Sequence, residues 1–277
     1  MIQDKIYKFL NLNYKDQVEG LKIDEVCFGS HLTAVRLTDG SYGVASTLSG
    51  KQRHCTKQNR DFGDFSPLNI RNQSVKSLFE TQRLSNAIDT LRIAVLNAIS
   101  SRILSSGRYR VIEDKDPIEL IDLKEAGTVT IVGAFHSYIE AVAAAGSRLH
   151  VLELNRDALN VECMKYYVPA EDYAKVIPES DVVIITGMTL VNNTIDGLLS
   201  VRKPETKVIV TGPSSSIIPD ILFENRVSII GATKIEKPEL LFQLVSEFGT
   251  GYHLFRYCAR KVCIINLSFA SVFRPLA

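Results

Sequence analysis

A group of small polar side chains follows an apolar run in the second half of the chain. Residues 182–185 are continuously apolar, and the polar residues after them are Thr186, Thr189, Asn192, Asn193 and Asp196. A buried strand that ends in such a group is the usual place for a ligand in an open α/β sheet. No strong nucleophile lies in the group, so it predicts ligand binding through Thr186, Thr189 and Asn192 more than it predicts a reaction. Asn193 and Asp196 also suit the capping of a following helix.

A second polar group, at residues 211–216, also follows a predicted strand and precedes a helix. Gly212 permits the close approach of a ligand, and the hydroxyls of Ser214 and Ser215 could join free N–H groups in an anion-binding cup. A carboxylate, a phosphate or the oxygens of a chelator would fit such a cup. The alternative is simple capping of the helix by serine.

Glu153 ends the second predicted strand of this half, about 20 residues after the turn at Gly133. An acid at this position binds ribose hydroxyls in nucleotide-binding α/β domains. The turn itself lacks the second and third glycines of the dinucleotide fingerprint, since Ala134 and Phe135 stand where a pyrophosphate needs bare backbone. We therefore expect no dinucleotide, whereas a nucleoside or an S-adenosylmethionine-like ligand needs no pyrophosphate site. The alternative is a tight turn with Glu153 in solvent.

Two histidines are candidate ligands for a divalent transition metal. His136 lies in the first turn of the second half, and His31 lies in an interrupted β-rich run with Thr33. Neutral imidazole binds borderline metals well, although a turn histidine bonded to backbone is an equal alternative for His136. Asn97 lies within an apolar helical pattern, which is costly unless its amide is bonded. His54 and Cys55 form a soft-metal pair in a polar stretch, for which a plain surface role is the stronger interpretation.

The first part of the chain must position His31, Thr33 and Asn97, and it reads as a mixed α+β unit. A short helix is expected over residues 6–12, and two β-rich runs, 26–37 and 42–47, flank an Asp-Gly turn typical of a hairpin. A polar loop is expected over 48–73. Apolar spacing over 74–106 predicts one long, well-buried helix that carries Asn97.

The second part alternates apolar runs with helical patterns. Strands are expected at 129–133, 149–153, 181–186, 207–212, 227–231 and 262–267, and helices at 138–145, 193–200, 219–224 and 238–247. Such alternation indicates a parallel sheet covered on both faces, a Rossmann-like doubly wound domain. Residues 114–117 resemble an inter-domain linker, and residues 268–277 fit no expected element.

Composition narrows the classes of partner. The chain has 277 residues and a net charge of +1, so charge gives no reason to expect nucleic acid or an anionic membrane as a partner. No apolar run reaches the ~20 residues that span a bilayer. The first residues are unlike a signal peptide, and the five cysteines are odd in number without a Cys-x-x-Cys pair. We therefore expect a cytoplasmic protein with reduced thiols, which could form a homo-oligomer.

Several segments together resemble one family. They are GSHLTAV at 29–35, LRIAVLNA at 91–98, VG at 132–133, LHVLE at 149–153, SDVVIITG at 180–187, LVNNTID at 190–196 and TGPS at 211–214. The chain resembles the bacterial and archaeal proteins described as putative heavy-metal chelation proteins, over residues 10–260. That resemblance implies an enolase N-terminal-like α+β domain at 1–112, a Rossmann-like α/β domain at 113–277 and a cleft between them. Asn193 and Arg156 depart from the family pattern, in which a glycine and a proline are common at these places.

Three functions remain open at this point. The first is the binding of a metal, a metal chelate or a small anion in the inter-domain cleft, by the polar groups above with His31 and His136. The second is a transferase or lyase that uses a nucleoside cofactor held by Glu153, with one of these histidines as acid or base. The third is a scaffold without catalysis. Each of the first two implies a small-molecule partner.

Overall fold

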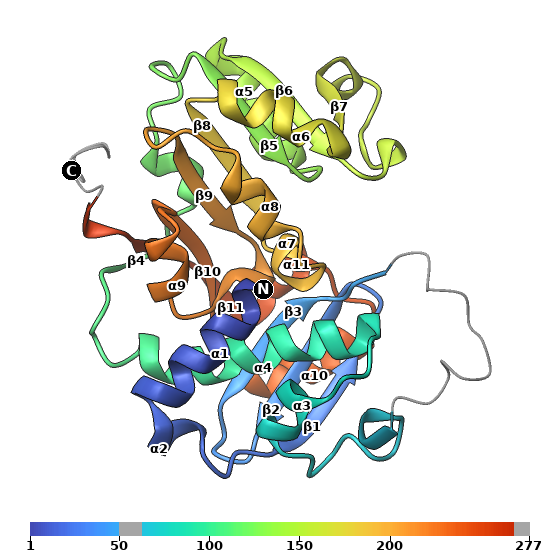
Figure 1. Ribbon diagram of the computed structural model, residues 1–277. Coiled ribbons are helices and arrows are strands. Elements are labelled where there is room, and N and C mark those ends of the chain that lie inside the picture. The colour runs from blue at the N-terminus through green and yellow to red at the C-terminus, as the bar shows by residue number, and fades with distance from the viewer. Residues whose placement is uncertain (50–62, 269–277) are drawn as a thin grey trace.

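The protein is described by a computed structural model over residues 1–49 and 63–268, and it is built on two sheets (Figure 1). The smaller sheet is antiparallel and has the order β1-β2-β3. Its strands are β1 (Ile23–Phe28), β2 (Leu32–Leu37) and β3 (Tyr42–Ser46). The expected hairpin is confirmed in β2 and β3. Its turn carries Gly40 at φ +80°, and the Asp39 carboxylate accepts the Ser41 N–H at 3.0 Å.

Helices surround the small sheet. The helix expected over 6–12 is confirmed as part of α1 (Ile2–Asn13), which is followed by α2 (Lys15–Val18). The single long helix expected over 74–106 is wrong, because the chain forms α3 (Val75–Glu80) and then α4 (Asn86–Leu104). Ser85 begins α4 by accepting the Ile88 N–H at 3.1 Å. Arg92 of α4 donates to the carbonyls of Leu78 and Thr81, which α3 leaves free at its end. The helical spacing of apolar residues continues across the break between α3 and α4, so the sequence pattern did not reveal the break.

The larger sheet has eight strands in the order β4-β11-β10-β9-β8-β5-β6-β7. They are β4 (Val111–Glu113), β5 (Thr128–Val132), β6 (Arg148–Glu153), β7 (Tyr167–Pro169), β8 (Val182–Thr186), β9 (Lys207–Thr211), β10 (Ile229–Ile235) and β11 (Ala259–Ile265). The sheet is mostly parallel, but β11 pairs antiparallel with both β10 and β4. A sheet of parallel strands throughout was therefore an incomplete prediction. Short β4, which ends just before the expected linker at 114–117, forms an edge of this sheet.

Strand order reverses direction at β5. After β5 the chain adds β6 and β7 on one side, and it then returns to add β8, β9 and β10 on the other. The helices of this part are α5 (His136–Ala145), α6 (Tyr173–Val176), α7 (Met188–Val191), α8 (Ile195–Ser200), α9 (Asp220–Glu224), α10 (Pro238–Ser246) and α11 (Gly251–Tyr257). The loops after β5 and β8 diverge at this reversal, and a crevice forms there in open α/β sheets.

The two sheets share their helices. Helix α10 follows β10 of the large sheet, yet Leu241 and Val245 on it pack against Leu32, Ala34 and Val44 of the small sheet. In Figure 1 the orange α10 accordingly lies beside the blue strands. Helix α4 covers the other face of the small sheet, and α1 packs against α9. The two sheets therefore bury their apolar faces together, while a division of the chain at residue 112 stays a prediction.

No helix within residues 1–49 and 63–268 is both long enough and apolar enough to cross a bilayer.

Candidate functional site

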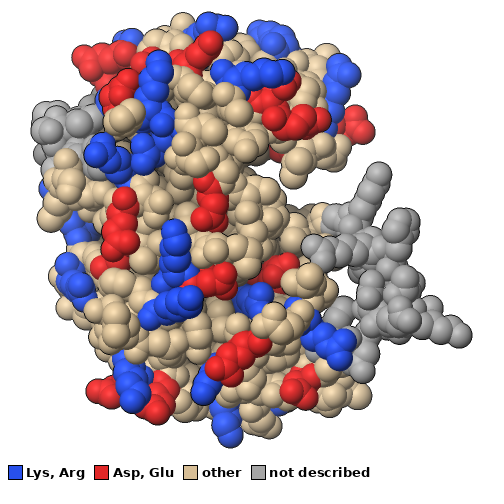
Figure 2. Space-filling model, in the orientation of Figure 1, with Lys and Arg blue, Asp and Glu red and all other residues tan. Residues whose placement is uncertain are grey.

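A pocket of about 560 Å³ opens at the carboxyl ends of β5, β6 and β8. Its lining residues are Val132, Gly133, Ala134, Leu152, Glu153, Leu154, Ala170, Glu171, Tyr173, Thr186, Met188, Thr189, Asn192, Asn193, Thr194, Gly197 and Leu198. Figure 2 shows the surface hollowed beside α6, α7 and α8. The pocket thus lies at the reversal of strand order. Four residues predicted from the sequence meet in it, namely Glu153, Thr186, Thr189 and Asn192.

Gly133 forms the floor of the pocket. Its φ is +107°, and an added Cβ would lie 3.2 Å from the Thr186 side chain. A residue with a side chain would therefore be strained here and would crowd the end of β8. The neighbouring Phe135 stacks on Tyr138 at a centroid distance of 5.4 Å. This turn leaves a bare backbone position at the crevice, but only one.

Two carboxylates lie on the pocket wall. Glu153 ends β6, and its Oε1 accepts the Asn155 N–H at 2.9 Å, so its other oxygen is left for a ligand. Glu171 lies in the short 3-10 turn Ala170–Asp172 after β7. A carboxylate whose backbone bond fixes its orientation can accept two neighbouring hydroxyls of a sugar. Within the described residues, neither carboxylate has an ion-pair partner.

The loop after β8 supplies amide and hydroxyl groups. Thr189 donates to the Thr186 carbonyl at 2.7 Å, and Asn192 Oδ1 accepts from both the N–H and the hydroxyl of Thr194. These bonds use the oxygen of Asn192 and leave its Nδ2 donors without a partner in the part of the chain that the structure describes. Asn192 is therefore a fixed donor at the pocket, whereas Thr189 is tied into its own loop.

The first turn of α1 holds the other end of this loop. Gln3 Nε2 donates to Asn193 Oδ1 at 2.5 Å, and the Ile2 N–H donates to Asp196 Oδ2 at 3.1 Å. Gln3 is only 1% exposed, and Asn193 takes the left-handed φ of +60°. The N-terminal helix thus helps to shape the pocket wall. No sequence pattern predicts this contact, which joins residues some 190 positions apart.

Thr33 and Asn97 hold elements together and do not line the pocket. Thr33 is fully buried, and its hydroxyl lies 2.8 Å from that of Thr47. Asn97 Nδ2 donates to the Val44 carbonyl at 2.7 Å and to the Pro213 carbonyl at 3.2 Å. Asn97 therefore joins α4, β3 and the loop after β9.

Gly212, Ser214 and Ser215 also face protein. Ser214 Oγ accepts the Ser46 N–H at 2.8 Å, and Ser215 donates to the carbonyls of Gly212 and Gly231. Both serines are 0% exposed. An added Cβ at Gly212 would lie 3.7 Å from the Gly187 nitrogen, so the two turns pack against each other. The expected anion cup is thus filled by the β3 backbone.

The candidate metal ligands are dispersed among the described residues. His31 is exposed and packs edge-on against Phe248 at 4.6 Å, while His136 Nε2 lies 3.1 Å from the Ala158 carbonyl. Neither lines the pocket, and residues 1–49 and 63–268 contain no group of three or more His, Cys, Asp or Glu side chains placed to bind an ion. His54 and Cys55 lie outside the described residues. The described side chains therefore do not fit a bare heavy-metal ion.

The described thiols are also poor soft-metal ligands. Cys27, Cys163, Cys258 and Cys263 are free and scattered, and burial raises the pKa of each. Burial, aided by Glu239, raises the pKa of Cys258 to about 11, and burial with nearby acids raises that of Cys263 to about 12. Since the thiolate is the metal ligand and the nucleophile, a raised pKa makes these groups weaker ligands and nucleophiles near neutrality.

Thiol titration tests this property in a Cys55→Ser variant, which leaves the four described cysteines. At pH 7.5 we expect at most one thiol, the half-buried Cys27, to react with Ellman's reagent within minutes. All four should react once the protein is unfolded in guanidinium. Adding Cys27→Ser should abolish the fast reaction, and two or more fast thiols in the folded protein would contradict the expectation.

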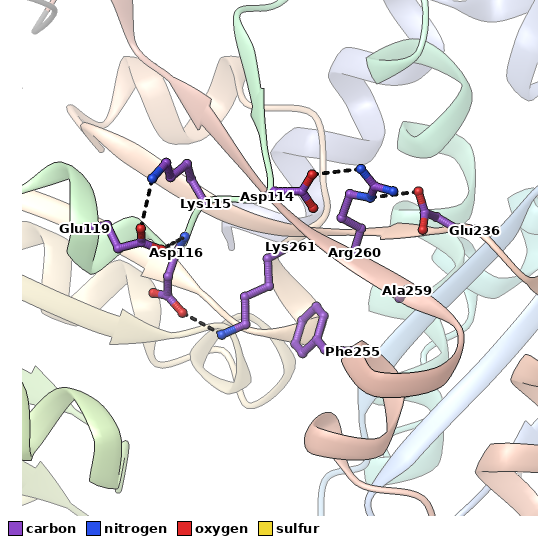
Figure 3. A pocket seen from close by; sticks show the side chains of 9 residues that line it. All are labelled: Asp114, Lys115, Asp116, Glu119, Glu236, Phe255, Ala259, Arg260 and Lys261. Atoms are coloured by element: carbon purple, nitrogen blue, oxygen red, sulfur yellow. Dashed lines mark hydrogen bonds and ion pairs between the residues drawn. The ribbon is translucent and has the colours of Figure 1, made fainter. Parts of the chain in front are cut away.

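A second cavity, of about 610 Å³, is lined by charged side chains that already pair with one another (Figure 3). Lys261 binds Asp116 at 2.6 Å, and Arg260 binds Asp114 and Glu236, each at 2.8 Å. Lys115 similarly pairs with Glu119. Because a ligand would have to break these pairs, the network is better explained as a tie between the segment after β4 and strand β11.

Some pocket residues carried no sequence pattern. Glu171 and Tyr173 lie on short turns after β7, and Met188 begins the one-turn helix α7. Strand β7 has only three residues, so its carboxyl end was not located from apolar runs. An isolated Glu near a Tyr is otherwise ordinary surface sequence.

Comparison with known proteins places this geometry in context. Two family models match, over residues 116–264 and 13–100, and both are described as "Putative heavy-metal chelation". An uncharacterized protein from Methanocaldococcus jannaschii is 24% identical, over 94% of this chain and 96% of its own length.

Two crystal structures of proteins of unknown function share the fold. The one from Pyrococcus horikoshii has a TM-score of 0.77 at 21% identity and covers 96% of this chain and 100% of its own. The one from Desulfitobacterium hafniense has a TM-score of 0.67 at 18% identity, with 94% and 100% covered. Both belong to the family whose model matches residues 116–264.

Proposed function

Since the chain belongs to the family described as "Putative heavy-metal chelation", we propose that it binds a small organic ligand of the nucleoside class in the pocket at β5, β6 and β8. The observation that carries the proposal is the placement of Glu153 at the end of β6, in a pocket at the reversal of strand order. Ligands of open α/β sheets bind at this reversal, and an acid at this strand end takes a ribose diol.

The walls of the pocket suit the rest of a nucleoside. Leu152, Leu198 and Met188 provide apolar surface for a flat heterocycle, and the free Nδ2 of Asn192 provides a donor. The volume of about 560 Å³ lies within the ordinary range for small-molecule sites. Its lining includes no His, Cys or Lys within the described residues, so we propose binding and assign no catalytic step.

A second candidate keeps the metal of the family description, bound as a complex with an organic molecule. It is favoured over a bare ion because the described side chains form no metal-binding cluster. The organic part would then occupy the same pocket and would carry the binding. Gly212, Ser214, Ser215, Thr33 and Asn97 would support the pocket from behind, through the contact of α4 and β3 with the loop after β9.

The proposal includes a fold assignment finer than mixed α/β. We infer that residues 113–277 are Rossmann-like, supported by β5-to-β10 topology, and that residues 1–112 are enolase N-terminal-like, supported by a three-stranded sheet packed on α4. Helix α10 would then belong to the second domain by sequence but pack against the sheet of the first.

Thermal unfolding of the purified protein tests the proposal. Adenosine at about 100 times its dissociation constant should add about 2.7 kcal/mol and raise Tm measurably. Mass spectrometry of freshly purified protein should show a bound nucleoside-class molecule. Elemental analysis should find no metal in protein from which that molecule has been removed. Stabilisation by bare Zn²⁺ or Ni²⁺ alone, lost in His31→Ala or His136→Ala, would instead support a protein-built metal site and overturn the proposal.

A further inference from the structure

Among the described residues, the charged side chains that line the pocket all have one sign. Its lining residues include the carboxylates Glu153 and Glu171 and no Lys, Arg or His. Glu171 has no hydrogen bond or ion pair within residues 1–49 and 63–268, and Glu153 accepts only a backbone N–H. Elsewhere in the described chain acids commonly have a basic neighbour, as in the pairs Lys261–Asp116 and Arg260–Glu236. Within residues 1–49 and 63–268, no basic side chain therefore pairs with either of the two pocket carboxylates.

The surroundings of the two carboxylates differ. Glu153 is half-buried in a cavity also lined by apolar side chains such as Leu152, Leu198 and Met188, so its field is screened less than on open surface, whereas Glu171 lines the cavity from an exposed position. Tyr173 adds an aromatic ring to the lining, and the face of an aromatic ring also attracts cations. The two carboxylates and the aromatic ring favour a positive charge in the ligand, and they disfavour a phosphate.

The turn after β5 gives an independent reason against phosphate. Phosphates bind where several free backbone N–H groups converge at a helix start. Here Phe135 and Ala134 follow Gly133, the Phe135 N–H donates to the Gly133 carbonyl at 2.9 Å, and Phe135 stacks on Tyr138. The position that holds a pyrophosphate in dinucleotide-binding domains therefore carries side chains instead of bare backbone.

We infer that the pocket selects nucleoside-class ligands that carry a positive charge, such as an ammonium or sulfonium group, and rejects their phosphorylated forms. This inference rests on the proposed function and adds the charge of the ligand to it. Glu171 is the residue that sets the selection, because Glu153 is engaged by Asn155 and by the sugar. Glu171 is thus the residue that determines the charge specificity of the pocket.

Calorimetric titration with three matched compounds tests the inference at pH 7.0. They are adenosine, adenosine 5′-phosphate and 5′-amino-5′-deoxyadenosine, which differ in charge at one position. We expect the amine to bind at least 5-fold more tightly than adenosine, and the phosphate at least 10-fold more weakly. The preference for the amine should shrink as NaCl is raised from 50 to 500 mM, since salt screens charge.

The variant Glu171→Gln keeps the size of the side chain and removes its charge. It should reduce the preference for the amine over adenosine to less than 2-fold. Glu162→Gln, at an exposed acid outside the pocket, should leave that preference unchanged. If adenosine binds and the amine binds no better, or if the phosphate binds best, the charge selection is overturned while the proposed function stands. If none of the three binds, the proposed function fails and the inference with it.

Discussion

Replacing Glu153 with alanine is expected to weaken adenosine binding by about 10- to 100-fold, since a hydrogen bond to a charged group contributes about 1.5–3 kcal/mol. The carboxylate ends β6 in the pocket, and the Asn155 N–H orients it. Calorimetric titration of both proteins with adenosine and with 2′-deoxyadenosine measures the effect. The unaltered protein should prefer the ribose, and Glu153→Ala should lose most of that preference.

Glu162→Ala is the matched control, because Glu162 is an exposed acid that does not line the pocket. It should leave both affinities and the preference for ribose unchanged. The two variants should unfold at similar temperatures, since neither glutamate is buried. Equal loss of adenosine and deoxyadenosine binding in Glu153→Ala would contradict a role in holding the sugar.

Replacing Gly43 with alanine is expected to reduce the free energy of unfolding by about 3 kcal/mol or more. Gly43 lies in β3 where α4 crosses it, and an added Cβ would lie 2.0 Å from the Ala94 carbonyl oxygen and 2.5 Å from the Ala98 nitrogen. Both are backbone atoms, so relief requires α4 to move away from the sheet. For a chain of this size such a loss lowers Tm by about 6–12 °C, which calorimetry or circular dichroism would measure.

Gly251→Ala provides the control for the same chemical change. Gly251 begins α11, and its added Cβ would meet only Pro213, at 3.8 Å, which is ordinary contact. We expect Tm to stay within about 2 °C or to rise slightly, because alanine is the better helix former. A Gly43→Ala protein as stable as this control would mean that α4 does not lie so close to β3.

The alternation of strands and helices was well predicted from the second half of the chain. Runs such as residues 182–185 and 208–210 are apolar throughout because neighbours cover both faces, and this pattern distinguishes them from surface strands. The sequence did not show which sheet each element packs against. The apolar stripe on α10 looks like that of any helix covering its own sheet, yet Leu241 and Val245 pack on the small sheet. The antiparallel direction of β11 could not be predicted either, because strand direction does not change amino-acid composition.

The sequence predicted which residues come together at one pocket where strand order decides their placement. Glu153 and Thr186 end β6 and β8, the parallel strands on either side of β5, so their meeting in one pocket follows from strand order. Prediction was less informative for polar groups in general, because a hydroxyl bonded inside the protein has the same sequence pattern as one awaiting a ligand. Ser214 and Asn97 illustrate this, since Ser214 accepts from Ser46 and Asn97 donates to Pro213 across the contact between the two sheets. Only the three-dimensional structure distinguishes a hydroxyl bonded inside the protein from one that is free to bind a ligand.

The placement of α10 also bears on the order in which the protein can fold during its synthesis. The small sheet is complete once Ser46 has been made, but α10, which covers one of its faces, begins about 190 residues later at Pro238. At about 5–20 residues per second the ribosome needs roughly 10–40 s for that interval. Throughout it, Leu32, Ala34 and Val44 present an apolar face with no native cover. The nascent chain therefore exposes this apolar face for a prolonged period, during which a chaperone could bind it. In the folded protein the same face is buried.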